Sequence, residues 1–303
     1  MKVADLPDRI RGLKREKNAV ILAHNYQLPE VQDVADFVGD SLGLSLEARK
    51  TEADLIVFCG VHFMAETAKI LNPARKVLMP DPQAGCPMAD MINGAQLAEM
   101  KQRHPQAKVV CYINSTAEVK ALSDLCCTSG NALEVVASLG KEEVLFVPDQ
   151  YLGSWVEEKL GRRMILWSGY CNIHVRITPE ALLEARREHP QALAMAHPEC
   201  PPAVRNLADY VASTSQMVTF PETVSAREFI VATESGILHQ LGKKYPDRRF
   251  YPAEKRSICP NMKKTSLEKV LWCLEDEKTE ILVEDSVARQ AGVCIRRMLE
   301  LRK

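Results

Sequence analysis

Three stretches of this chain align with one another without gaps, and this internal repeat limits the possible folds more than any other feature of the sequence. They cover residues 24–41, 112–129 and 197–214, at offsets of 88 and then 85 residues. Two apolar columns and one acidic column match in this register: Val31, Val119 and Val204; Val34, Leu122 and Leu207; Asp36, Asp124 and Asp209. Such a repeat indicates three copies of one supersecondary unit.

Each copy carries the same order of expected elements. An apolar run, a polar loop and a helical pattern closed by the shared aspartate come first, and two further apolar runs follow. The three sets of runs are AVILA, LIVFCG and KVLMP; KVVC, EVLFVPD and RMILW; and ALAMA, EFIVATE and RRFYP. Strands that alternate with helices predict units with a parallel sheet.

We therefore expect an α/β protein of three similar αβα, Rossmann-like domains, related by pseudo-threefold symmetry around a central active site. A chain of 303 residues is too long for one small core, which agrees with this division. The expected limits are residues 1–87 for the first domain, with the C-terminal segment 280–303 packed on it, 88–174 for the second and 175–279 for the third.

The charge pattern argues against two classes of partner. The net charge is −1, and Lys and Arg are spread along the chain without the basic stripe that nucleic acid requires. No apolar run approaches the roughly 20 residues of a membrane span, and the N-terminus is charged rather than signal-like. We expect a cytoplasmic protein that binds neither nucleic acid nor a membrane.

Polar residues recur where each first strand is expected to end. In parallel α/β units these strand ends carry the chemistry. The residues are His24, Asn25 and Tyr26; Tyr112, Ile113 and Asn114; and His197, Pro198 and Glu199, with the hydroxyls of Ser41, Ser129 and Thr214 closing the three stretches. Helix capping is the alternative explanation. Recurrence in three copies favours convergence on one cavity.

Three of the ten cysteines, Cys86, Cys171 and Cys259, occupy equivalent positions after the last expected strand of each unit. Disulfides seldom persist in a reducing compartment, so thiols or metal ligands are expected. Three thiolates suit a 4Fe-4S cluster with one iron left open as a Lewis acid. Burial as small hydrophobes is the alternative. We assign it to cysteines in apolar patterns and leave Cys200 open; the former are Cys59, Cys111, Cys126, Cys127, Cys273 and Cys294.

These blocks together resemble the quinolinate synthase (NadA) family. The resemblance runs nearly end to end, through AHNYQLPEVQDVADFVGDS, AGCPMADM, YINSTAEVKA, GYCNIH, HPECPP, ADYVASTSQM and CPNMKKTSL. It implies three αβα domains around a pseudo-threefold axis. It also implies the condensation of iminoaspartate with dihydroxyacetone phosphate to quinolinate, with loss of phosphate and two waters, in de novo NAD biosynthesis.

The resemblance further implies one 4Fe-4S cluster, because Cys86, Cys171 and Cys259 match the family's ligands. An L-aspartate oxidase or an aspartate dehydrogenase would supply iminoaspartate. Substrate-site positions fall on His24, Ser41, Tyr112, Asn114, Ser129, His197, Glu199 and Thr214. One position departs from the family pattern, since Gln216 stands in STSQM where the family often has glycine.

Roles for individual residues follow from the chemistry of condensation and dehydration. These steps need a base and an acid within hydrogen-bond reach, and we assign them to Glu199 with His197, while Tyr26 and His24 handle the triose. His174, close after Cys171, contacts cluster or substrate, or else makes a structural hydrogen bond. Lys263 and Lys264 either assist phosphate release or form an exposed basic turn.

Two other functions fit an open-site cluster. A different hydro-lyase would share the iron chemistry and accept other hydroxy acids. An iron or redox sensor would use the cluster only to change shape, but a sensor ordinarily carries a DNA-binding or partner-binding module, and the sequence has no recognisable one.

Overall fold

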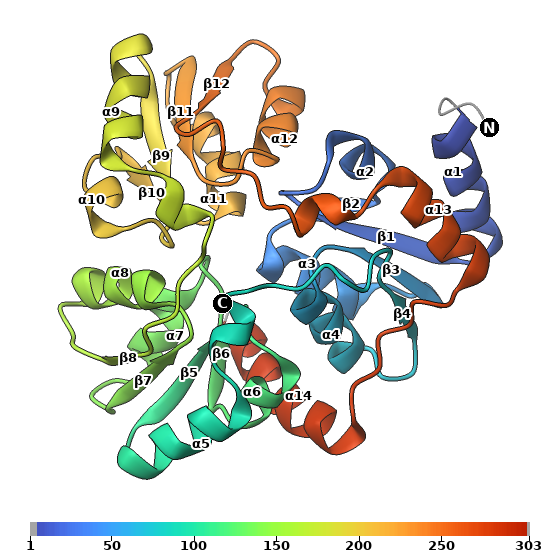
Figure 1. The fold of residues 1–303 in the computed structure, drawn as a ribbon, viewed down its shortest axis with the longest axis horizontal. Coiled ribbons are helices and arrows are strands. Elements are labelled where there is room, and N and C mark those ends of the chain that lie inside the picture. Colours follow the sequence, from blue (N-terminus) through green and yellow to red (C-terminus); the bar gives the residue numbers. More distant parts are fainter. Residues whose placement is uncertain (1–4, 302–303) are drawn as a thin grey trace.

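The computed structural model describes residues 5–301, which form three parallel four-stranded sheets arranged around a common centre (Figure 1). The strand orders are β2-β1-β3-β4, β6-β5-β7-β8 and β10-β9-β11-β12. Within each unit, the strand that comes first in the sequence therefore lies between the second and the third, and the fourth pairs with the third at the edge of the sheet. The expected α/β fold of three similar αβα units is confirmed.

The first unit contains α1 (Leu6–Glu16), β1 (Ala19–His24), α2 (Pro29–Val34), β2 (Phe37–Gly39), α3 (Ser41–Lys50), β3 (Leu55–Cys59), α4 (His62–Leu71) and β4 (Lys76–Leu78). All five residues of β3 are buried. A parallel strand covered by helices on both faces reads as a continuous apolar run, as LIVFC does.

The second unit contains η2 (Ala89–Met91), α5 (Gly94–Arg103), β5 (Lys108–Tyr112), α6 (Ala117–Ala121), β6 (Leu125–Cys127), α7 (Ala132–Ser138), β7 (Val144–Val147), α8 (Gln150–Leu160), β8 (Ile165–Leu166) and η3 (His174–Arg176). Its third strand, β7, is also buried throughout.

The third unit contains α9 (Pro179–Glu188), β9 (Leu193–Ala196), α10 (Pro202–Arg205), β10 (Tyr210–Val211), α11 (Thr214–Thr219), η4 (Phe220–Thr223), β11 (Glu228–Ala232), α12 (Ile237–Lys244), β12 (Arg249–Pro252) and η5 (Met262–Lys264). Two helices end the chain, α13 (Leu267–Asp276) and α14 (Asp285–Glu300).

The shared aspartates explain why the repeat is visible in the sequence. Oδ2 of Asp36 accepts the backbone N–H of Ile21 at 2.8 Å, and the Asp36 N–H donates to the carbonyl of Ile21 at 2.9 Å. The other two aspartates make the same pair of bonds with Val109 and with Ala194. Each carboxylate thus fixes where the second strand begins beside the first.

The terminal helices lie against earlier parts of the chain. α13 packs on α1, Glu280 bridges to Leu78 at the end of β4, and α14 packs against α6, β6 and α4. Segment 280–301 therefore starts beside the first unit and continues onto the second. Sγ of Cys294 in α14 lies 2.9 Å from Sγ of Cys126 in β6. The expected domain limits stay a prediction.

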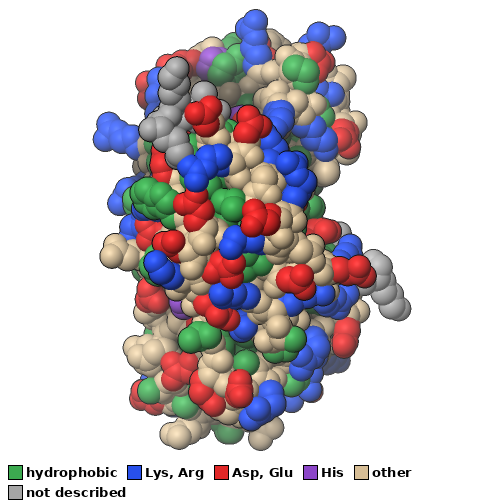
Figure 2. Space-filling view, turned by 90° about the vertical axis from the view of Figure 1, so that its right-hand side faces the viewer, with side chains coloured by type: hydrophobic (Ala, Val, Ile, Leu, Met, Phe, Trp, Pro, Cys, Tyr) green, Lys and Arg blue, Asp and Glu red, His purple; other side chains and the backbone are tan. Residues whose placement is uncertain are grey.

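Acidic and basic side chains are interspersed over the face shown in Figure 2. Within residues 5–301, no helix is both long enough and apolar enough to pass through a lipid bilayer.

Candidate active site

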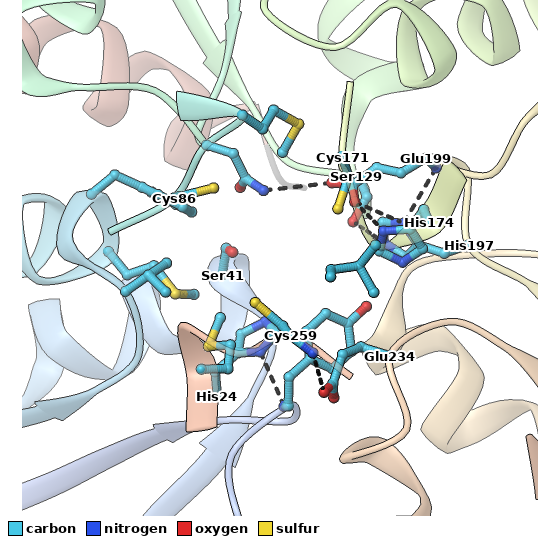
Figure 3. Close-up of a pocket in the computed structure, with 18 of the residues that line it drawn as sticks. His24, Ser41, Cys86, Ser129, Cys171, His174, His197, Glu199, Glu234 and Cys259 are labelled. Atoms are coloured by element: carbon cyan, nitrogen blue, oxygen red, sulfur yellow. Dashed lines mark hydrogen bonds and ion pairs between the residues drawn. The ribbon is translucent and has the colours of Figure 1, made fainter. Parts of the chain in front are cut away.

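A central cavity receives side chains from all three units. All the residues that we assigned to the site from the sequence line it: His24, Tyr26, Ser41, Cys86, Tyr112, Asn114, Ser129, Cys171, His174, His197, Glu199, Thr214 and Cys259. Strand ends of three sheets meet here because the units share one topology. The sulfur atoms of the three cysteines point into the cavity from different sides (Figure 3).

The three cysteine loops have the same local structure. In each loop the backbone carbonyl of the cysteine accepts the N–H of the residue four positions later, which opens a short 3-10 turn, η2, η3 or η5. In each loop, too, the backbone N–H groups two and three residues after the cysteine interact with its sulfur. Equivalent sequence positions have thus folded into equivalent loops.

Burial raises the pKa of all three thiols, that of Cys86 to about 12. Neighbouring negative groups also raise the pKa of two of these thiols: Cys259 that of Cys86, and Glu199 that of Cys171. A metal displaces the thiol protons when it binds. Sulfurs that collect in one cavity, with N–H groups directed at them, fit a metal or cluster better than a packed core.

Glu199 is the most connected polar group in the cavity, although only 3% of it is exposed. Tyr112 donates its hydroxyl proton to Oε1 at 2.5 Å, and Nδ1 of His174 lies 2.7 Å from Oε2. Burial raises the pKa of this carboxyl, but His174, His197 and the Tyr112 hydroxyl outweigh burial and hold it well below its usual range. Glu199 is therefore a carboxylate at neutral pH, ready to accept a proton.

The imidazoles are stacked and tied to hydroxyls. The rings of His174 and His197 stack with centroids 4.7 Å apart. Nε2 of His197 is 3.1 Å from Oγ of Ser129, and Nε2 of His174 is 2.8 Å from Oγ1 of Thr233. Burial lowers the pKa of His197 to about 3 and outweighs the Glu199 carboxylate, which acts in the opposite direction. His197 is thus a neutral imidazole at pH 7.

The loop after β1 forms the opposite wall. The ring of His24 meets the ring of Tyr26 edge-on at 4.5 Å, and the Tyr26 hydroxyl lies 2.5 Å from Oγ1 of Thr233. Burial is the main cause that lowers the pKa of His24 to about 3, and the neighbouring His197 adds to the shift. Nδ2 of Asn25 donates to Oγ1 of Thr214 at 2.8 Å, which joins the first unit to the third.

Neighbouring residues do the helix capping that was the alternative explanation for the cavity hydroxyls. Asp40 caps α3, accepting the N–H of Gly43 at 2.8 Å, and Ser213 caps α11. The hydroxyls of Ser41 and Thr214, one position further on, line the cavity instead.

Comparison with known proteins shows the family to which the chain belongs. The family described as Quinolinate synthetase A protein (NadA) matches residues 8–300. A quinolinate synthase of Dehalococcoides mccartyi (strain BAV1) is 53% identical over 293 residues, covering 97% of both chains. Those of Alkaliphilus metalliredigens and Methanosarcina barkeri are each 49% identical, over 303 and 302 residues, and cover at least 99% of either chain. The chain belongs to the quinolinate synthetase A family.

One departure from the family pattern has a structural explanation. Gln216 is the third residue of α11, where it completes a capping box: Oε1 accepts the N–H of Ser213 at 2.9 Å, while the Gln216 N–H donates to the Ser213 hydroxyl. A glutamine here stabilises the start of the helix that presents Thr214.

Several polar residues of the site were missed from the sequence: Asp40, Thr128 and Asn172 line the cavity, and Thr233 and Glu234 have structural roles in it. Thr233 and Glu234 follow β11 and lie outside the three aligned stretches, so the repeat could not nominate them. The strand-end rule alone would have found them, because EFIVATE ends on these two residues. Glu234 lines the cavity (Figure 3), and Thr233 bridges His174 and Tyr26.

The cavity also contains a second possible set of metal ligands, which shares Cys171 with the three cysteines. The ligand atoms of Cys171, His174 and Glu199 lie within 4.8 Å of one another, close enough to hold one metal ion. A four-iron cluster separates its cysteine sulfurs more widely than a single ion separates its ligands. Cys171 could therefore be a ligand either of a single metal ion or of a four-iron cluster.

Proposed function

We propose that this chain is a quinolinate synthase that condenses iminoaspartate with dihydroxyacetone phosphate in the central cavity, releasing phosphate and two waters. The observation that carries the proposal is the meeting of three equivalent cysteine loops with the Glu199 carboxylate in one buried site. The curated relatives, about half identical over the whole chain, support the same activity.

Cys86, Cys171 and Cys259 are the residues that would hold one 4Fe-4S cluster. Their shared loop geometry and their position around one cavity support this ligand set. When bound, the cluster supplies a Lewis acid for a substrate oxygen through the iron that no cysteine ligates. His174, between Cys171 and Glu199, is placed to touch either the cluster or the substrate.

Glu199 is the general base in this proposal. Glu199 is ionised at neutral pH, and Tyr112 and His174 fix the directions of its two oxygens, so its geometry suits removal of the proton next to a carbonyl. Once protonated, Glu199 becomes the acid that returns a proton to a departing hydroxyl. Neutral His197, tied to Ser129, assists as a second acceptor.

Other cavity residues bind and orient the substrates. Both substrates are anions, and the hydroxyls of Ser41, Ser129 and Thr214 beside helix N-termini donate to such groups without adding charge. The amide of Asn114, with Nδ2 3.5 Å from Oε1 of Glu199, is placed beside the base. His24 and Tyr26 form the wall assigned to the triose.

The setting of the reaction is also a proposal. An aspartate-oxidising enzyme, an L-aspartate oxidase or an aspartate dehydrogenase, supplies the unstable imine, and the pathway leads to NAD in the cytoplasm.

Anaerobic iron and sulfide analysis tests the ligand set, and product analysis tests the reaction. We expect four irons and four sulfides per wild-type chain, and loss of the cluster in Cys86→Ala, Cys171→Ala and Cys259→Ala. Incubation with iminoaspartate and dihydroxyacetone phosphate should yield quinolinate by mass spectrometry. A stable cluster that dehydrates other hydroxy acids and gives no quinolinate would assign the chain to a different hydro-lyase reaction.

Glu199→Gln is the matched variant for the base. It keeps the size of the side chain and should keep the cluster absorbance, yet abolish quinolinate formation. Unchanged turnover in this variant would remove Glu199 from the mechanism.

A further inference from the structure

A second threefold relation lies behind the cysteine loops. The third residue after each unit's third strand donates its N–H to the carbonyl two positions before a cavity cysteine: His62 to Ala84, Gln150 to Gly169 and Ser235 to Ser257, each at 2.9 Å. One position earlier stand Val61, Asp149 and Glu234. Two of the three cysteine loops therefore have a buried carboxyl group behind them, and the loop of Cys86 has a valine.

Glu234 is bonded directly to a cysteine loop. Its Oε1 accepts the backbone N–H of Cys259 at 2.9 Å, and its Oε2 accepts the N–H of Gly236 at 2.7 Å. Only 1% of this side chain is exposed. A buried carboxylate needs such partners to offset its loss of hydration.

Lys263 balances the charge of Glu234 and extends the connection. Its Nζ lies 3.0 Å from Oε1 of Glu234, and it also donates to the backbone carbonyl of Tyr26. Lys263 belongs to the Cys259 loop, since its N–H bonds the Cys259 carbonyl at 3.2 Å. The ion pair thus connects the Cys259 loop to the substrate wall. Lys263 is therefore not part of an exposed basic turn, since only 18% of its side chain is exposed; its part in phosphate release stays a prediction.

The backbone is shaped to let this pair form. A Cβ atom on Gly236 would come within 2.8 Å of Oε2 of Glu234 and of the Tyr26 backbone, and within 2.7 Å of Nζ of Lys263. Glycine is therefore required where the chain passes the ion pair.

Asp149 has the equivalent place in the second unit. Its side chain is fully buried, and Oδ1 accepts the N–H of Leu152 at 2.7 Å at the start of α8. The Cys171 N–H also faces this carboxyl group, while Oδ2 lacks a hydrogen-bond partner among residues 5–301.

We propose that Glu234, with Lys263, is a positioning residue that holds the Cys259 loop through its backbone and couples it to Tyr26, and that Asp149 is its counterpart behind Cys171. The inference rests on the proposed function, because it takes these loops as the cluster-binding loops. Groups outside the ligands orient them and tune a metal centre in this way. Because a valine stands behind Cys86, the three cysteine loops have unequal polar surroundings.

Glu234→Gln tests the proposal, with Asp209→Asn as its matched control. Asp209 is also a carboxylate that accepts a backbone N–H, that of Ala194 at 2.7 Å, but it does not line the cavity. The first measurement is residue-resolved amide exchange in the cluster-free protein. Glu234→Gln should exchange the Cys259 amide about tenfold faster or more and leave Cys86 unchanged, because a neutral amide oxygen is a weaker acceptor than the carboxylate and cannot pair with Lys263. Asp209→Asn should speed the exchange of the Ala194 amide and leave that of the Cys259 amide unchanged.

The second measurement is the electron paramagnetic resonance spectrum and midpoint potential of the reconstituted cluster. Removing the Glu234 charge should alter the spectrum and shift the potential to a more positive value, and Asp209→Asn should change neither. If Glu234→Gln does not fold, Glu234→Asp replaces it: the shorter carboxylate keeps its charge beside Lys263 but does not reach the Cys259 N–H. The same faster exchange is expected, with a smaller shift in potential.

Unchanged exchange of the Cys259 amide overturns the proposal. Faster exchange with a wild-type spectrum and potential also overturns it, because the loop would then have no influence on the cluster. Neither measurement uses quinolinate formation, and the exchange measurement needs no cluster. A wild-type protein that makes no quinolinate would therefore defeat the proposed function and leave this result standing.

Discussion

At the scale of single residues, the cavity is organised by hydroxyl groups that hold rings in place. The Thr233 hydroxyl lies between Nε2 of His174 and the Tyr26 hydroxyl, at 2.8 and 2.5 Å. It thereby connects the ring beside Glu199 to the wall assigned to the triose. The two rings also make a tilted contact, with centroids 6.3 Å apart.

We expect Thr233→Val to lower kcat roughly tenfold, because two hydrogen bonds are lost without a change in side-chain shape. Thr233→Ser, which keeps the hydroxyl, is the control and should stay near wild type. Steady-state quinolinate formation under anaerobic conditions measures both. Equal activity of the valine variant and wild type would mean that the rings are held by packing alone.

The buried histidines predict how stability depends on pH. His24 and His197 have pKa values of about 3 in the folded chain, below the 6.5 of an exposed histidine. The unfolded chain therefore binds more protons below pH 6.5, and the free energy of unfolding should fall as pH decreases from 6.5 toward 3.

Urea unfolding of the cluster-free protein at pH 7.5 and 5.5 measures this loss. His24→Gln should reduce it, whereas His62→Gln, which replaces an exposed histidine outside the cavity, should leave it as in wild type. A loss of stability that is the same in all three proteins would contradict the assignment to buried histidines.

The sequence predicted the cavity residues unusually well because the repeat compared three copies of each position. Thr233 and Glu234 escaped because their equivalents differ: Gly60 and Val61 in the first unit, Pro148 and Asp149 in the second. Residues that act in only one or two units leave no column to align. The role of Lys263 likewise depends on Tyr26, which is distant in sequence.

At the scale of helices and strands, the repeated aspartates hold the first two strands of each sheet in register. Asp36 and Asp209 also form ion pairs, with Lys14 and Arg186, but Asp124 pairs with no cation that the structure describes. Asp124 therefore isolates the contribution of the backbone bond, N–H of Val109 to Oδ2 at 2.8 Å.

Asp124→Ala should lower the free energy of unfolding by about 1–3 kcal/mol, because the Val109 N–H loses its charged acceptor. Glu134→Ala, on a neighbouring helix, is a control without such a bond. Chemical denaturation of both variants measures the difference. A loss no larger than that of the control would mean that strand pairing alone sets the register.

The terminal helix α14 shows what the repeat could not predict. It has no counterpart in the other units, and its buried face covers α6 and β6, so its packing depends on contacts between distant parts of the chain. The expectation that this segment packs on the first unit had no matched position in the repeat to support it and stays a prediction; α14 contacts α4 of that unit as well as the second unit.

Two residues of α14, two positions apart, test how much its packing contributes. Ile295 is fully buried, whereas 43% of Val293 is exposed. Ile295→Ala should lower the free energy of unfolding by about 2–5 kcal/mol and Val293→Ala by well under half as much. Thermal unfolding measures both, and equal losses would indicate that α14 is not tightly packed on the second unit.

At the scale of the whole molecule, the cavity is where the three units are joined. At the centre, the first and third units are joined by the bonds of Asn25 with Thr214 and of Lys263 with Tyr26. The second and third units are joined by the bond of Tyr112 with Glu199. The first and second units meet instead through Lys120, whose buried Nζ donates to the Thr67 hydroxyl at 3.1 Å and to the Phe63 carbonyl at 3.4 Å.

A cluster held by one cysteine from each unit would add a covalent connection among all three. Because it binds only the folded arrangement, loading should raise the thermal midpoint of the whole chain in a single transition. Anaerobic differential scanning calorimetry of loaded and cluster-free protein measures this rise. Cys86→Ala should abolish it. Cys59→Ala, which changes a fully buried cysteine of β3 outside the cavity, should lower both midpoints and keep the rise between them. A loaded protein that unfolds in separate steps would show that the cluster does not unite the three units.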